Sequence, residues 1–262
     1  MDPAAAALLV AAGFAAGLVG SVAGLASLFS YPALLAVGLP PIAANVTNTV
    51  GLFSTTVGSA AASRSELRGQ RGRIVRFGAL AAAGGAMGAW LLLNTDEGVF
   101  ELIVPWLIAL GSLLLIGRDT VRRLAARAAA RGGRRGTGRG GRSGPVALGV
   151  AVALVGVYGG YFGAAAGVLM LALLSVALDE SLAVSNALKN LTTGAANLVA
   201  AVSYAFLAPV NWWAAAALAC GCLLGSAMGP ALVRRLPERP LRWAVSLAGF
   251  ALAAHLFVSA LR

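Results

Sequence analysis

The chain has 262 residues, of which 59% are hydrophobic and only 11% are charged, and its formal net charge is +11. This composition excludes a soluble protein, because a single soluble core could not bury so much apolar surface. The charge does not indicate a nucleic-acid-binding protein, because the arginines gather in three clusters between apolar stretches, as in cytoplasmic loops of membrane proteins. We therefore predict an all-α polytopic membrane protein without a nucleic-acid partner.

Residues 1–117 are predicted to form a first membrane repeat. The apolar run at 4–39 is too long for one straight transmembrane helix, so we expect a re-entrant or broken helical hairpin. Its interruptions are Gly17, Gly20, Gly24 and Pro32. Three transmembrane helices are then expected, at residues 42–63, 74–93 and 98–117.

Residues 118–144 are rich in arginine and glycine and are predicted to be a cytoplasmic linker, flexible from about residue 132 onwards. We expect this linker and the other basic loops to contact anionic lipid headgroups. Residues 145–262 form the second predicted repeat. They comprise a second broken hairpin at 145–178 and transmembrane helices at 181–207, 212–233 and 243–260.

The second half of the sequence repeats the first. The glycines at 17, 20 and 24 align with those at 156, 159 and 163 at a shift of 139 residues. After a gap of one residue near Pro40, the pair Thr47-Asn48 aligns with Ser185-Asn186, and Ser54-Thr55 with Thr192-Thr193. Matched polar pairs inside two apolar helices are uncommon, so we interpret the pattern as an internal repeat.

The distribution of arginines predicts that the two repeats are inverted. With the basic loops inside and the acidic loop near Asp96 outside, the spans alternate correctly only if each hairpin enters and returns on one side. The predicted architecture is therefore two inverted repeats, each a re-entrant or broken hairpin plus three transmembrane helices. Secondary transporters have this architecture, with the binding site at the repeat interface.

Lys189 is the only lysine in the chain, and it lies inside an apolar run with no acidic residue at its own depth. An ammonium group in the membrane is costly, and such residues are usually functional. A transient anionic ligand would be a suitable partner. The alternative is that the side chain reaches back to the membrane interface, because Lys189 is only about a turn and a half into the run.

The polar residues around Lys189, and those at the equivalent positions of the first repeat, predict an anion-binding site. Asn48 and Asn186 lie in the first turns of two helices, where free N–H groups and the helix dipole favour negative charge. Glycine turns allow the backbone to approach a ligand closely. The predicted substrate-binding residues are Thr47, Asn48, Ser185, Asn186, Lys189, Asn190, Gly20, Gly24, Gly159 and Gly163. The alternative role for the Thr, Ser and Asn residues is hydrogen bonding between helices.

Residues 17–68 resemble the first repeat of the TauE/SafE sulfite exporter family. The resemblance depends on the segments Gly17–Gly20, Pro32–Leu35, Gly38–Pro41, Thr47-Asn48 and the arginine loop at 64–73, and residues 156–194 resemble the second repeat. The sequence departs from the family at Ala164–Ala166, where glycine is more usual, and at Leu171, which aligns with Pro32. The resemblance implies transport of sulfite, sulfonates or sulfoacetate across the cytoplasmic (inner) membrane.

Three other residues are chemically capable of a role in the site. Cys220 and Cys222 are interpreted as packing residues and His255 as an interfacial histidine, with roles in sulfur chemistry and proton transfer as the alternatives. Enzyme activity is not expected, because the sequence lacks the acid pairs, Ser/His pairs and metal-binding motifs of intramembrane enzymes. Neither a cofactor nor a metal site is predicted.

Two alternatives to a transporter are an anion channel and a membrane scaffold that transports nothing. The oligomeric state is left open, with a homodimer as one option. No carboxylate is expected inside the spans, so proton coupling of the usual kind is not predicted. Export of a monovalent anion would be favoured by about 2.3 kcal/mol per 100 mV of membrane potential.

Overall fold

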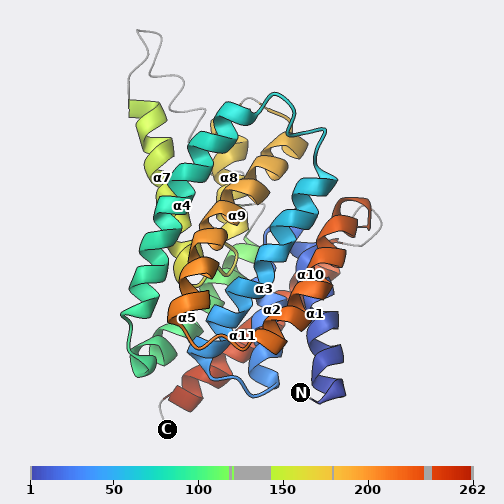
Figure 1. The fold of residues 1–262 in the computed structure, drawn as a ribbon, viewed down its shortest axis with the longest axis vertical. Coiled ribbons are helices and arrows are strands. Elements are labelled where there is room, and N and C mark those ends of the chain that lie inside the picture. The colour runs from blue at the N-terminus through green and yellow to red at the C-terminus, as the bar shows by residue number, and fades with distance from the viewer. Residues whose placement is uncertain (1, 118–119, 121–142, 179, 233–237, 261–262) are drawn as a thin grey trace.

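The computed structural model describes residues 2–117, 120, 143–178, 180–232 and 238–260. The regular secondary structure of these residues consists of helices alone. The helices are α1 (Pro3–Ala23), α2 (Ser27–Ala36), α3 (Pro41–Ala62), α4 (Arg71–Leu93), α5 (Glu97–Ile116), α7 (Ser143–Tyr161), α8 (Ala166–Ala177), α9 (Leu182–Leu207), α10 (Trp212–Leu232) and α11 (Glu238–Ala260). The start of α1 and the end of α11 lie at the same end of this bundle (Figure 1).

Both long apolar runs are broken into two helices, as the sequence predicted. Helix α1 ends at Gly24, whose φ of +77° is readily adopted only by glycine, and α2 begins three residues later. Helix α7 ends before Gly163, at φ +76°, and Ala165 also has a positive φ of +59°. The two glycines are 139 residues apart. The α1–α2 hairpin occupies the lower part of the bundle in Figure 1, and the α7–α8 hairpin occupies the upper part.

Glycines bring each hairpin into close contact with a helix from the other half of the chain. Helix α1 packs against α10, and α7 packs against α4. A Cβ atom at Gly17 of α1 or Gly225 of α10 would overlap backbone carbonyl groups of the opposing helix, and the same holds for Gly88 of α4 and Gly160 of α7. Such spacing of small residues is typical of helix contacts in membranes, where close backbone approach maximises van der Waals contact.

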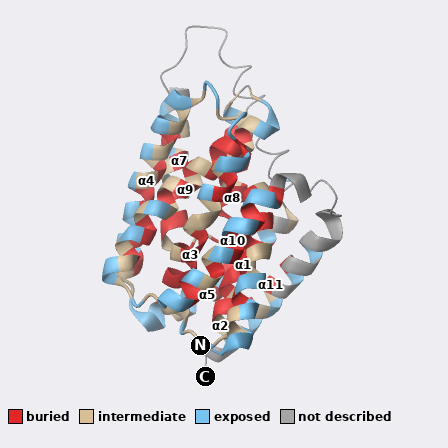
Figure 2. Ribbon diagram, turned by 45° about the vertical axis from the view of Figure 1, so that its right-hand side comes forward, coloured by how far each residue is buried: buried red, intermediate tan, exposed pale blue. Residues whose placement is uncertain are grey.

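The outer surface of the bundle is apolar. Buried residues line the inward faces of the helices, whereas the outward faces are exposed (Figure 2). Trp106 is 65% exposed and Phe206 is 83% exposed. Among the described residues, four helices are long and apolar enough to cross a membrane. Together these features identify an integral membrane protein whose exposed apolar side chains face lipid.

The predicted linker at 118–144 lies almost wholly outside the described residues, as do Arg234 and Arg235 of the last basic loop. Helix α7 begins at Ser143, so it includes the last two residues of the predicted linker.

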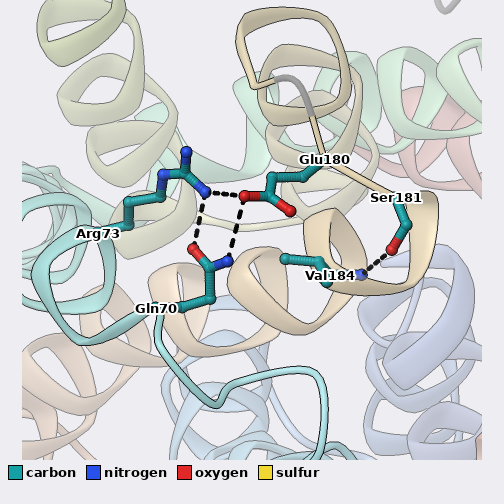
Figure 3. Close-up of polar contacts among 5 residues, drawn as sticks. All are labelled: Gln70, Arg73, Glu180, Ser181 and Val184. Atoms are coloured by element: carbon teal, nitrogen blue, oxygen red, sulfur yellow. Dashed lines mark hydrogen bonds and ion pairs between the residues drawn. The ribbon is translucent and has the colours of Figure 1, made fainter.

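An ion pair joins the two halves of the chain at the end of the bundle where α4 and α9 begin. Glu180 precedes α9 and accepts hydrogen bonds from Arg73 and, at 3.3 Å, from Gln70 (Figure 3). These hydrogen bonds and the charge of Arg73 lower the pKa of the Glu180 carboxyl below its usual value. Ser181 then caps α9 by accepting a hydrogen bond from the Val184 N–H at 3.3 Å. Glu180 therefore links the start of α9 to the start of α4.

We expect Gly225→Ala to destabilise the fold, because its new methyl group would overlap the Phe14 carbonyl oxygen in the α1–α10 contact. Overpacking of this kind costs about 1–3 kcal/mol. The matched control is Gly72→Ala in the exposed first turn of α4, where nothing lies within 4 Å of the new atom. That variant should be neutral or slightly stabilising, by up to about 1 kcal/mol. Thermal unfolding in detergent would compare them, and equal melting temperatures would contradict the described packing.

Exchanging the charges of Arg73 and Glu180 tests the ion pair. Arg73→Glu and Glu180→Arg should each lower the melting temperature, and the double variant should recover most of the loss because opposite charges face each other again. Because the Glu180 pKa is lowered in the folded state, the pair stabilises above the usual glutamate pKa, and this contribution is lost as the pH falls through the lowered value. Additive losses in the double variant would show that the two groups do not interact.

Candidate functional site

Lys189 is buried in the centre of the bundle. Its side chain is 1% exposed, and its Nζ atom lies 3.2 Å from the Gly20 carbonyl oxygen and 3.4 Å from that of Ser21. Both carbonyl groups belong to the last turn of α1, which ends inside the protein. The ammonium group is therefore directed toward a helix end inside the bundle.

Two amide side chains of α9 reach the same end of α1. Asn186 and Asn190 donate hydrogen bonds from their Nδ2 atoms to the Ser21 carbonyl oxygen, at 3.1 and 2.9 Å. The last carbonyl groups of a helix have no partner within it, and the helix dipole places partial negative charge there. Together with Lys189, these donors satisfy the end of α1 from a single helix of the other half of the chain.

The end of α7 is satisfied by neutral donors. The Gly160 carbonyl oxygen, which aligns with that of Ser21, accepts a hydrogen bond from the Tyr204 hydroxyl of α9. The next carbonyl group, at Tyr161, accepts one from the Asn45 Nδ2 atom of α3 at 2.9 Å. The two broken helices thus end in similar environments, but only α1 ends against a charged side chain.

A cavity of about 60 Å³ lies between these helix ends. The first turns of α2 and α8 line it through residues such as Ser27 and Gly167, so two helix N-termini face it. The residues that line it include Gly20, Gly24, Ser27, Thr55, Thr56, Ser59, Gly159, Gly163, Gly167, Lys189, Asn190, Thr193 and Asn197. Asp and Glu are absent from the described lining.

The structure brings six of the ten predicted site residues to the cavity. They are Gly20, Gly24, Gly159, Gly163, Lys189 and Asn190. The other four do not line it, although Thr47, Asn48 and Ser185 are buried and Asn186 is partly buried. The Thr47 hydroxyl accepts a hydrogen bond from the Asn211 backbone N–H at 3.0 Å, and Asn186 binds the end of α1. The side-chain atoms of Asn48 have no hydrogen-bond partner among the described residues.

The polar lining also includes residues that the sequence prediction missed. Thr55, Thr56 and Ser59 contribute from α3, and Thr193 and Asn197 contribute from α9. The alignment of Thr55 with Thr193 was a signal that could have found them, because both extend the polar faces of the two helices by further turns. The helix N-termini that face the cavity are those of α2 and α8, whereas the sequence suggested those of α3 and α9.

Many lining residues are equivalent under the sequence repeat. Gly20 aligns with Gly159, Gly24 with Gly163, Ser27 with Ala166, Leu52 with Asn190, Thr55 with Thr193 and Ser59 with Asn197. Where α3 and α9 cross, the Thr56 side chain occupies the space that a Cβ atom at Gly194 would need. These two contacting residues are also 138 apart, so they are each other's repeat equivalents.

Replacing Asn186 and Asn48 by leucine should separate their structural roles. Asn186→Leu removes a hydrogen bond and leaves the Ser21 carbonyl with fewer donors, so we expect a loss of about 1–3 kcal/mol in unfolding free energy. Asn48→Leu replaces an amide that has no partner, so the variant should be at least as stable as the wild type. Thermal unfolding of the two purified variants would test this, and an equal loss in both would contradict it.

The other candidates lie away from the cavity lining. Cys222 is buried and Cys220 is exposed, so the two thiols face different environments. Among the described residues, no three His, Cys, Asp or Glu side chains gather closely enough to hold a metal ion. The polar chemistry around the cavity consists of one ammonium group, hydroxyls, amides and backbone N–H groups.

Comparison with known proteins agrees with this chemistry. A family model described as "Sulfite exporter TauE/SafE" matches residues 9–256, which is nearly the whole chain. No curated protein and no solved structure matches the chain.

Proposed function

Because the chain belongs to the TauE/SafE sulfite exporter family, whose members are membrane transporters, we propose that it carries small sulfur-containing anions across the cytoplasmic membrane by binding them in the central cavity. The observation that carries this proposal is the position of Lys189. It is a buried ammonium group in the wall of a cavity whose described lining contains no carboxylate.

The surroundings of the cavity favour an oxyanion. Several of the first N–H groups of α2 and α8 donate to carbonyl groups just before these helices, so the two N-termini contribute chiefly the partial positive charge of the helix dipoles. The second N–H of the Asn190 amide can replace one of the hydrogen bonds that an oxyanion loses on leaving water. The Thr55 and Thr193 hydroxyls donate to helix carbonyl groups, at 2.7 and 2.8 Å, and would have to turn away from them to bind the anion. The ammonium group of Lys189 adds a full charge.

The size of the cavity favours sulfite over longer sulfonates. A buried water needs at least about 10–15 Å³, so 60 Å³ corresponds to about four waters. That space suits an ion with one sulfur and three oxygens. Sulfoacetate or another short sulfonate would fit only its sulfonate group, and the rest of the molecule would require the cavity to widen during transport.

The arrangement of the helices supports the predicted inverted repeats and a transport cycle. Helix α1 contacts α10 as its counterpart α7 contacts α4, and α10 contacts α3 as α4 contacts α9. The cavity lies among equivalent residues, beside the contact of Thr56 with Gly194. In secondary transporters, a binding site at the interface of two inverted repeats is exposed alternately to the two sides of the membrane. The membrane potential would favour export of a monovalent anion by about 2.3 kcal/mol per 100 mV.

Flux of radiolabelled sulfite and of a short sulfonate into proteoliposomes tests the proposal. Wild-type flux should saturate with sulfite, and Lys189→Ala should reduce it at least about tenfold, because a charge-assisted contact contributes about 1.5–3 kcal/mol. Lys189→Arg keeps the charge with a different shape and should retain part of the flux. Cys220→Ala, on an exposed position outside the cavity, serves as the control with normal flux.

Each contrary result has a defined meaning. Flux that rises linearly with concentration would indicate a channel. Normal sulfite flux in folded Lys189→Ala would show that the anion does not bind at this residue. Absence of flux for both anions in the wild type would favour the scaffold alternative.

A further inference from the structure

The end of α1 has the composition of a cation site. Two carbonyl oxygens of its last turn, at Gly20 and Ser21, lie 3.2 and 3.4 Å from the Lys189 Nζ atom. They are at the negative end of a helix dipole and in a region screened from water, where such interactions are strengthened. The amides of Asn186 and Asn190 hold the Ser21 carbonyl group in place.

Carbonyl groups at the ends of broken transmembrane helices commonly coordinate the coupling cation in secondary transporters. Here the corresponding position is filled by a covalently attached ammonium group. We propose that the end of α1 is a monovalent-cation site that Lys189 occupies permanently, so that the protein needs no dissolved cation for coupling. The lysine therefore acts as a tethered counter-ion for the helix end and for the anion in the adjoining cavity.

The second broken helix supports this assignment by contrast. The end of α7 interacts with neutral donors, the Tyr204 hydroxyl and the Asn45 amide. The residue that aligns with Lys189 in α3 is Gly51, so no lysine can reach α7 from the equivalent position. Of these two related helix ends, the end of α1 thus contacts a charged side chain. That side chain, Lys189, also lines the cavity.

Chemical rescue of Lys189→Ala tests the cation site. n-Propylammonium supplies the atoms that the substitution removes, and methylammonium supplies a smaller cation of the same charge. Either amine should raise the melting temperature of the purified variant by about 3 °C at saturating concentration, because it binds only the folded state. The wild type, whose site is occupied, should not respond. n-Propanol has a similar shape without charge and should have no effect on either protein.

A test of the cation site by sulfite flux rests on the proposed function, whereas a test by melting temperature does not. In proteoliposomes the amines should restore sulfite flux of Lys189→Ala by about tenfold, the factor lost with the lysine. Wild-type flux should be equal in sodium, potassium and choline buffers. Asn190→Ala keeps the lysine, so its flux should not respond to amines. Lys189→Met provides a neutral side chain of similar length if the alanine variant does not fold, and its flux should stay low.

Three results would overturn the inference. They are a wild-type flux that requires sodium, a melting temperature of Lys189→Ala that neither amine changes, and an equal response to n-propanol. Absence of wild-type sulfite flux combined with stabilisation of the variant by amines would instead contradict the proposed function and leave the cation site standing.

Discussion

Two helices of this protein end in the middle of the membrane-embedded bundle, and their last carbonyl groups must be satisfied without water. An unsatisfied backbone group in such a region costs several kcal/mol. Helix α9 supplies Lys189, Asn186 and Asn190 to the end of α1, and α3 and α9 supply donors to the end of α7. The polar character of α3 and α9 follows from this requirement, and it also provides the groups that line the cavity.

The glycine contacts make this arrangement sterically attainable. Side chains of α9 reach the carbonyl groups of α1 only because the helices around them lie very close together. Gly24 and Gly167 are in backbone contact where α1 ends and α8 begins, so the two hairpins meet directly at the cavity. A larger residue at either position would separate the hairpins and enlarge the space around Lys189. Local backbone freedom at Gly24 and close packing thus determine the size of the site.

The sequence was sufficient to predict the broken helices, because glycines inside apolar runs too long for one span are local signals. It also identified Lys189, because a single lysine in an apolar helix is conspicuous without knowledge of its contacts. The difference between Asn186 and Asn48 could not be predicted. It depends on contacts between distant segments, because the Gly160 carbonyl, which aligns with that of Ser21, is bound by Tyr204 of α9. The N-termini of α2 and α8 were missed because their orientation depends on how the hairpins fold back.

The packing of α1 and α7 against helices of the opposite half of the chain has a consequence for biosynthesis. Helix α1 packs against α10, which is made about 200 residues later, whereas α7 meets the already inserted α4 at once. During translation the glycine face of α1 therefore remains without its final partner until most of the chain has left the ribosome. Neither half can complete its own contacts alone, so separately expressed halves would have to associate in the membrane before either could reach its final fold.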